Sequence, residues 1–192
     1  MRTKKVFLVA LLVTIGLVSV NSAKAQSGDD PADNNVTVNI KLHPIQSLVV
    51  TEGQRTVDIE YQTPEDYKNG KISEQQLDHL TVFSTGGFTI SVKSDGNFVN
   101  AEGYSESIDA GDVQIVAEAG TDNDANDSYT NVDLSTDNQS LIISETGARE
   151  RKYNITYNNE AGKDDKYLSY YNMSYGNPTV YTAQVTYSIE PK

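Results

Sequence analysis

The chain has 192 residues, no cysteine, and 27 acidic against 15 basic residues, which gives a formal net charge of −12. A surface of this sign repels nucleic acid and anionic lipid head groups, so neither is expected as a partner. The lack of cysteine excludes disulfide bonds and a thiol nucleophile. The fold therefore has to be stabilised by apolar packing and strand pairing.

The first 25 residues have the three parts of a secretory signal peptide. Basic residues precede an uncharged run of 15 residues, 6–20, which is followed by the small-x-small sequence Ala23-Lys24-Ala25. A helix that spans a bilayer needs about 20 apolar residues, so cleavage after Ala25 is favoured over a retained anchor. Cleavage leaves 167 residues (192 minus 25) with 11 Lys and Arg against 27 Asp and Glu, a formal charge of −16. We expect an exported protein of the bacterial periplasm, the cell surface or the extracellular space, without membrane insertion after cleavage.

After the signal peptide, we expect a flexible polar leader, residues 26–35, and a single domain, residues 36–192. The leader holds no apolar residue larger than alanine, so it cannot bury a core. From residue 36 the sequence alternates strictly between apolar and polar residues. Residues two apart share one face of a strand, so this alternation predicts a half-buried β-strand. Its apolar members are Val36, Val38, Ile40 and Leu42.

The same period of two recurs along the chain and predicts further short strands. The apolar residues of these runs are Val57, Ile59 and Tyr61; Phe88, Ile90 and Val92; Val113, Ile115 and Ala117; Leu141 and Ile143; Tyr153, Ile155 and Tyr157; and Tyr181, Ala183, Val185, Tyr187 and Ile189. Gly86-Gly87 predicts a tight hairpin between two runs. Ser73 with Gln76 permits at most one helical turn.

Short strands joined by polar turns, without alternating helices, predict an all-β fold. We expect an antiparallel immunoglobulin-like or pilin-like β-sandwich of about seven to nine strands, with a barrel as the alternative. Its first and last strands are expected near sheet edges.

No sequence motif of a known enzyme site is present. The two histidines, His43 and His79, lie outside any metal-binding spacing and are expected in a turn or on a sheet surface. We therefore predict a protein that is not an enzyme. A hydrolase with scattered carboxylates is the alternative, because a carboxylate pair leaves no local motif.

An acidic run suggests one metal site. Oxygen ligands at alternate positions and a carboxylate at the twelfth position are typical of a calcium loop, although Asp127 stands where such loops have glycine. A calcium site and a solvated acidic hairpin loop both stay open, and no other cofactor is expected. The candidate calcium ligands are Asp122, Asp124, Asn126 and Asp133.

Tyrosine dominates the aromatic residues, with 12 Tyr against four Phe and no Trp. One interpretation is cross-strand packing within the sheets. The other is a surface that contacts glycan or protein, because a tyrosine ring has an apolar face and a polar tip. The candidate contact residues for that surface are Tyr167, Tyr170, Tyr171 and Tyr175.

The alternating residues 36–42 behind a leader, together with the closing sequence YTAQVTYSI of residues 181–189, resemble small bacterial exported surface proteins of the fimbrial-subunit and spore-coat-U-like type. The closing sequence also resembles the end of the WxL cell-wall-binding domain, with Tyr187-Ser188-Ile189 in place of Trp-x-Leu. The fimbrial resemblance implies donor-strand exchange, in which an N-terminal strand of one subunit completes a sheet of the next. It makes the four apolar residues of 36–42 the candidate strand-exchange residues.

Two functions are therefore predicted. The first is a non-enzymatic, fimbria-like subunit of the cell surface, structural or adhesive, whose residues 36–42 pair either with their own sheet or with another subunit. The alternative is a monomeric β-sandwich module that binds glycan or cell-envelope material. The expected partners are accordingly other surface or fimbrial subunits, or glycan and envelope material.

Overall fold

The computed structural model describes residues 34–192 apart from residues 104, 122, 124–125 and 172–177. The expected signal peptide and most of the expected leader lie outside the described residues. Internal contacts divide the chain into two compact units, residues 1–41 and residues 42–192. Among the described residues, no helix has the length and apolar character needed to span a membrane.

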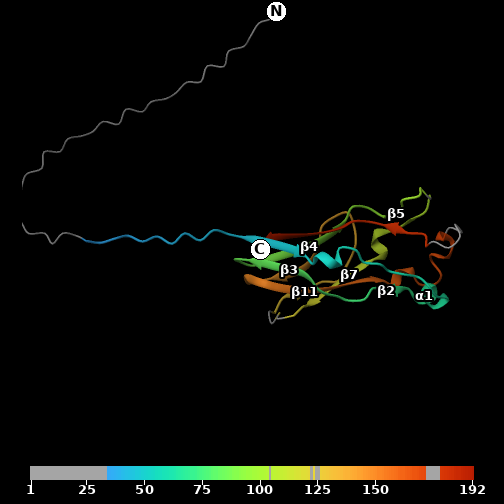
Figure 1. Ribbon diagram of the computed structural model, residues 1–192, viewed down its shortest axis with the longest axis horizontal. Helices are drawn as coiled ribbons and strands as arrows, with labels where there is room; N and C mark the ends of the chain where they lie inside the picture. The colour runs from blue at the N-terminus through green and yellow to red at the C-terminus, as the bar shows by residue number, and fades with distance from the viewer. Residues whose placement is uncertain (1–33, 104, 122, 124–125, 172–177) are drawn as a thin grey trace, which may run out of the picture. The chain divides into compact units, whose positions relative to one another are not determined.

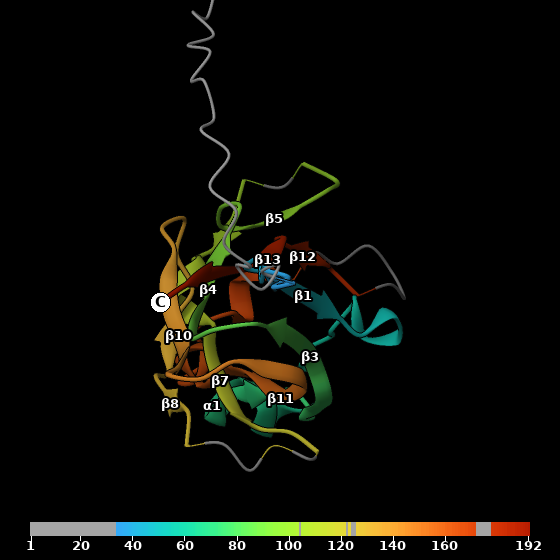
Figure 2. The ribbon, with the colours of Figure 1, turned by 90° about the vertical axis from the view of Figure 1, so that its left-hand side faces the viewer.

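Residues 42–192 form antiparallel sheets that pack as a sandwich, as Figures 1 and 2 show. The strands of the larger sheet are β1 (Gln46–Val50), β2 (Lys71–Ile72), β3 (Gln76–Ser84), β7 (Gln114–Ala119), β9 (Val132–Asp133) and β11 (Ala148–Asn159). Their order is β1-β3-β11-β7-β9, with β2 paired to β11. The strands of the second sheet are β4 (Phe88–Ser94), β8 (Ser128–Tyr129), β10 (Gln139–Ser144) and β13 (Val185–Pro191), in the order β13-β4-β10-β8. A small third sheet consists of β5 (Phe98–Asn100), β6 (Ser107–Ile108) and β12 (Tyr181–Thr182).

The predicted all-β antiparallel sandwich is confirmed. Seven strands, β1, β3, β4, β7, β10, β11 and β13, have five residues or more, and the six others described have only two or three. The last strand, β13, lies at a sheet edge as predicted, and β1 lies at the edge of the other sheet. These two edge strands lie side by side.

The core lies between the two larger sheets and contains apolar members of most of the alternating runs, those of residues 36–42 excepted. Burying one Ile, Leu or Phe side chain contributes about 1.5–3 kcal/mol. In β10 a register shift between Ser140 and Ile142 places both Leu141 and Ile142 in the core, so the expected alternation of Leu141 with Ile143 is interrupted there. The fully buried core residues include Leu80, Val82, Phe88, Ile90, Val92, Ile115, Leu141, Ile142, Tyr153 and Ile155.

The turn at Gly86-Gly87 does not form the predicted hairpin. It connects β3 to β4, which belong to different sheets, so the chain crosses the sandwich at this corner. The chain crosses back between β10 and β11, and the two corners pack against each other. A Cβ atom on Gly147 would lie 2.7 Å from the Ser84 carbonyl oxygen, and one on Gly87 would lie 3.0 Å from the Ser144 carbonyl oxygen. Glycine is therefore required by close backbone approach here, not by a hairpin.

Serine hydroxyls bind the backbone where three of the strands end. Ser84 and Ser144 are the last residues of β3 and β10, and both are buried. The Ser84 hydroxyl donates to the Gly86 carbonyl over 2.7 Å, and the Ser144 hydroxyl donates to the Thr146 carbonyl over 3.1 Å. Ser94, the last residue of β4, repeats the contact with the Gly96 carbonyl over 2.6 Å. Each hydroxyl thus satisfies a backbone group that the ladder no longer pairs.

The predicted strand at residues 36–42 is not formed. Residues 34–44 contain no helix or strand and are exposed. The first strand is β1, and the residue before it, Ile45, exchanges hydrogen bonds with Thr85. Strand β3 ends at Ser84 and the chain then turns into the other sheet, so the ladder has no residues beside the chain before Ile45. Pro44, which lacks an N–H group, lies between residues 36–42 and β1.

A second expected strand lacks a ladder partner. Val57, Ile59 and Tyr61 are half-buried and alternate with exposed residues as predicted, and Val57 and Ile59 pack on the core. The structure nevertheless assigns no strand to residues 56–62. The periodicity identified the buried side of this segment without specifying a backbone partner.

The helical elements lie in the connections between strands. Four 3-10 helices are described: η1 (Glu52–Gln54), η2 (Ala110–Asp112), η3 (Glu160–Gly162) and η4 (Leu168–Tyr170). The single described α-helix, α1 (Pro64–Asn69), begins with a capping box of Thr63 and Asp66. The helical turn allowed at Ser73 and Gln76 is not formed: Ser73 instead pairs with the backbone of Tyr157, and Gln76 begins β3.

Two consecutive residues in left-handed conformation fasten α1 to the connection between η3 and η4. The N–H groups of Asp164 and Asp165, with φ angles of 57° and 61°, donate to the carbonyls of Lys68 and Tyr67. The last carbonyls of a helix have no partner within it, so these contacts complete the end of α1.

Candidate functional site

The sequence analysis singled out residues in four places: the tyrosine-rich end, the acidic loop, the two histidines and residues 36–42. The tyrosine-rich end lies at α1, η3 and η4. There Tyr167 is 5% exposed, so it is not available as a surface contact. Its hydroxyl donates to Asp112 Oδ2 over 2.9 Å and accepts from Asn159 Nδ2 over 3.2 Å.

A chain of tyrosine rings runs through this end of the sandwich. Tyr61 packs against Tyr67 and Tyr167, with ring centroids 5.1 and 5.6 Å apart. Tyr167 packs on Tyr170, which packs on Tyr181. Burial raises the pKa of Tyr61 to about 12 and also raises the pKa of Tyr167, so both phenols stay neutral at physiological pH. Among these tyrosines Tyr167 is buried and the others are half-buried, so the enrichment here is largely explained by packing of tyrosine rings on one another.

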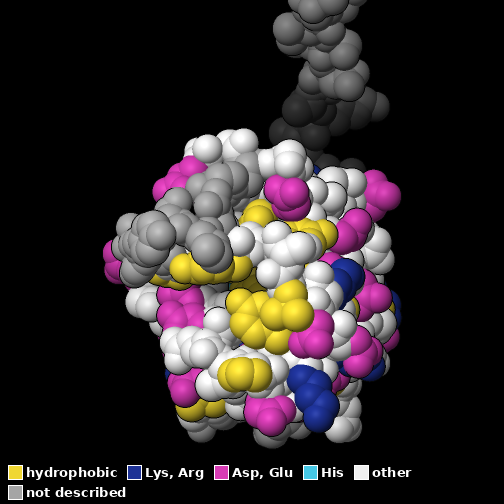
Figure 3. All heavy atoms as spheres, turned by 90° about the vertical axis from the view of Figure 1, so that its right-hand side faces the viewer, with side chains coloured by type: hydrophobic (Ala, Val, Ile, Leu, Met, Phe, Trp, Pro, Cys, Tyr) yellow, Lys and Arg dark blue, Asp and Glu magenta, His cyan; other side chains and the backbone are white. Residues whose placement is uncertain are grey.

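Part of the predicted contact surface is exposed. Tyr171 is 47% exposed, Tyr170 is half-buried, and Tyr175 lies outside the described residues. Leu168 and Val180 are also exposed here, at 58% and 57%. Figure 3 shows apolar side chains gathered on this end with acidic side chains around them.

A shallow depression lies next to the buried Tyr167 network. It is lined mainly by carboxylates, amides and backbone: Gly111, Asp112, Gln114, Asp133, Asn158, Glu160 and Ala161. Its polar groups largely bind one another. Gln114 Nε2 donates to Asp133 Oδ1 over 3.0 Å, and Asp112 accepts from Lys166 and Tyr167.

The proposed calcium ligands lie partly outside the described residues, because Asp122 and Asp124 are not described. Of the other two, Asn126 is exposed, and Asp133 lies in β9 opposite Gln114. Within the described ranges, no group of three or more His, Cys, Asp or Glu side chains is arranged to hold a metal ion. The calcium site remains a prediction.

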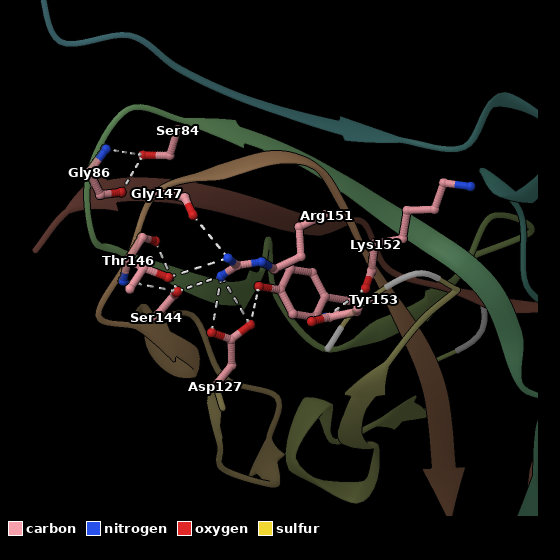
Figure 4. Close-up of polar contacts among 10 residues, drawn as sticks. Ser84, Gly86, Asp127, Ser144, Thr146, Gly147, Arg151, Lys152 and Tyr153 are labelled. Carbon is pink, nitrogen blue, oxygen red and sulfur yellow. Dashed lines mark hydrogen bonds and ion pairs between the residues drawn. The ribbon is translucent and has the colours of Figure 1, made fainter. Parts of the chain in front are cut away.

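Asp127, at the end of this acidic loop, takes part in a buried ion pair that the sequence analysis did not identify (Figure 4). Its carboxylate lies 3.2 Å from Nη1 of Arg151, and their side chains are 2% and 13% exposed. The Tyr153 hydroxyl donates to Asp127 Oδ2 over 2.6 Å. Burial, followed by the contact with Asp127, raises the pKa of Tyr153, so this phenol stays neutral.

The remaining donors of Arg151 are directed at the corner between β10 and β11. The guanidinium donates to Ser144 Oγ over 2.6 Å, to the Gly147 carbonyl over 2.9 Å and to Thr146 Oγ1 over 3.3 Å. It also lies over the ring of Phe88, with Cζ 5.9 Å from the centroid. This cluster joins the end of the acidic loop to both sheets. Both groups of the ion pair are bound in these structural contacts.

The two histidines differ in environment. His43 is exposed in residues 34–44. His79 is 2% exposed and points into the core, which corrects the expectation of a turn or sheet-surface position. The reason is local: Asp78 has a left-handed φ of 52°, which breaks the alternation of β3, so His79 and Leu80 are both buried.

The strand-exchange candidates are the most exposed large apolar side chains of the described chain. Val36, Val38, Ile40 and Leu42 are 83%, 79%, 83% and 90% exposed. Within the described part of the chain, these four residues belong to no strand and are not members of the core cluster. Comparison of the sequence with protein-family models and with curated proteins finds no match.

Proposed function

We propose that this chain is an exported, non-enzymatic, fimbria-like subunit of a bacterial surface structure, which assembles by adding residues 36–42 to a sheet edge of a second copy. One observation carries the proposal: four apolar side chains at alternate positions are 79% to 90% exposed in a segment that forms no strand of its own chain. A two-residue period gives a strand one apolar face that can be buried, and residues 36–42 bury no such face by themselves.

The free edges of the sandwich support strand addition. Strands β1 and β13 end the two larger sheets, so among the described strands each has a ladder partner on one side only. The two strands also lie side by side. Strand β13 has seven residues, as many as the segment 36–42. Main-chain hydrogen bonds would provide affinity and the alternate side chains would provide specificity.

The polar clusters support a structural role. Arg151 and Asp127 bind each other and the corner between the sheets, while Asn159, Asp112 and Tyr167 bind one another where β11, η2 and the start of η4 meet. The contacts of Arg151 with Asp127, and of Asp112 with Asn159 and Tyr167, join residues at least 24 positions apart, so each of them fixes the position of two strands or connections.

The test is the size of the exported product. The full-length chain is expressed in a bacterium and analysed on SDS gels without boiling, next to the double variant Val38→Asp, Ile40→Asp. The control, Thr37→Asp with Asn39→Asp, adds the same charge on the polar side of the segment. The wild type and the control should form a ladder of multimers, and the double variant should run as a monomer, because a buried unpaired charge costs several kcal/mol.

A single monomer band for the wild type would reject the proposal. Retention of that monomer on polysaccharide or envelope fractions, weakened by alanine at Tyr170 and Tyr171, would favour the binding module instead. A ladder that persists in the Val38→Asp, Ile40→Asp variant would assign assembly to another segment.

A further inference from the structure

His79 lies where the edge strands of the two sheets meet. Its ring projects from β3 into the core, and its Nδ1 atom lies 2.9 Å from Oε1 of Gln54, in η1, which follows β1 closely. Its Nε2 atom lies 3.2 Å from the hydroxyl of Tyr157 on β11. That hydroxyl lies 2.9 Å from the hydroxyl of Tyr187 on β13. One buried ring thus connects η1 with the edge strand of the opposite sheet.

Ring packing reinforces this connection. The imidazole meets the rings of Tyr157 and Tyr187 edge-on, with centroids 6.0 and 5.9 Å apart. Burial raises the pKa of both tyrosines, so they carry no charge at neutral or mildly acidic pH. His79 is therefore the group in this chain of contacts that can change its charge between pH 5 and 8.

No charged group offsets a proton on the ring among the residues described around it. The polar partners from η1, β11 and β13 are the amide of Gln54 and the two phenols. Next to His79 on β3, Asp78 is bonded to Lys152 and to the backbone of Thr121. The charged residues beside Gln54 and Tyr187 in sequence, Glu52, Arg55 and Glu190, are exposed to solvent.

Protonation also reverses the hydrogen bonds. With Gln54 Oε1 as an acceptor, Nδ1 of the neutral ring donates and Nε2 accepts the proton of Tyr157, so the Tyr187 hydroxyl donates to Tyr157. A protonated ring donates from both nitrogen atoms. Tyr157 then accepts from His79, so within this chain of contacts either its own proton or the proton of Tyr187 is left without an acceptor.

We propose that His79 is a proton-sensitive latch that holds η1 and β13 in place when neutral and loosens both when protonated. This inference does not depend on whether the chain assembles, although the loosened elements border the free edges of both sheets.

The direction of the effect follows from linkage. Burial lowers the pKa of His79 below its ordinary value, so the folded protein binds fewer protons than the unfolded chain once the pH falls below about 6.5. The latch is therefore complete above about pH 6.5 and weakens as the pH falls below that value. The loss reaches its limit when the pH passes below the pKa of the folded state.

Hydrogen exchange tests the latch, with rates corrected for intrinsic chemical exchange at each pH. Protection is compared at about pH 7.5 and about pH 5, on either side of the ordinary pKa of histidine. In the wild type, protection of β13 and η1 should fall about tenfold for each unit by which burial lowers the pKa. Residues of β10, which β4 separates from β13, should keep their protection where they exchange by local fluctuation without unfolding of the chain.

Three variants identify the group. His79→Gln should remove the pH dependence of both elements, and His43→Gln, which changes the exposed histidine, should retain it. Tyr187→Phe keeps the titrating ring but breaks the link to β13, so β13 should lose its pH dependence while η1 keeps it. This variant decides the matter even if His79→Gln does not fold.

Three results would overturn the latch. The first is protection of β13 and η1 that does not change with pH in the wild type. The second is an equal loss at the locally exchanging residues of β10, which would show that the effect is not confined to the elements that His79 contacts. The third is a pH dependence of β13 that persists in His79→Gln or in Tyr187→Phe.

Discussion

Residues 36–42 and strand β13 have the same alternation of apolar and polar residues, yet only β13 pairs within the chain. Strand β13 lies along β4 over its whole length, from Val185 opposite Ser94 to Pro191 opposite Phe88. Residues 36–42 have no such neighbour, because β3 leaves the larger sheet at Ser84. An alternating pattern therefore specifies which side of a segment is to be buried, whereas the length of the neighbouring strand decides whether it pairs.

The largest expected difference between the two segments is their sensitivity to charge. Ile189 of β13 is half-buried, packs on the core and lies opposite Ile90. Ile189→Asp should lower the free energy of unfolding by about 3 kcal/mol, because it places an unpaired carboxylate against the core. Ile40→Asp, at a side chain that is 83% exposed, should change it by less than about 0.5 kcal/mol.

Urea denaturation of the monomeric fraction measures both values. Equal destabilisation by the two substitutions would mean that residues 36–42 contribute to the folded monomer, which contradicts the contrast drawn between the segments.

The corner that ends β3 offers a second comparison. Gly147→Ala should destabilise the fold by about 1–3 kcal/mol, because the new methyl group would lie 2.7 Å from the Ser84 carbonyl oxygen and backbone atoms would have to move. Gly86→Ala is the matched control, since no atom lies within 4 Å of its Cβ position, and it should cost less than about 0.5 kcal/mol. Thermal unfolding of both variants gives the comparison. A larger effect at Gly86 would show that the two corners do not pack as described.

The smallest expected effect concerns Pro44. If the end of β3 is what leaves residues 36–42 unpaired, Pro44→Ala should change stability by less than about 0.5 kcal/mol and leave these residues unprotected in hydrogen exchange. Protection that appears in the variant monomer would show instead that the proline, by lacking an N–H group, prevents a longer strand.

The sequence predicted the faces of strands better than their partners. The buried sides of β4, of β7 and of β11 from Tyr153 onward follow from alternation alone, because these stretches keep their period. The crossing at Gly86-Gly87 was missed, since a glycine such as Gly87 suits a close backbone approach as well as a tight hairpin. Nothing local in the sequence distinguishes these two uses.

The polar clusters could not be predicted from local sequence patterns, for a similar reason. Asp127 is one of several acidic residues in its loop, and Arg151 one of several charged residues in its strand. Their pairing depends on the fold, which brings the loop to the corner between β10 and β11. The burial of His79 was missed because a single left-handed residue, Asp78, shifts the alternation by one position. Of the predicted contact tyrosines, Tyr167 was misplaced because an aromatic core and an aromatic surface have the same composition.

The strand order has a consequence for when the molecule can fold. Strands β3 and β4 lie early in the chain, but the neighbours that complete their sheets, β10, β11 and β13, lie between residues 139 and 191. A nascent chain that has not reached these residues cannot close either layer, and such long-range pairing is slow. Its apolar strands stay open until synthesis has passed these residues. Such a chain can still be threaded through a narrow pore long after its first strands have been made.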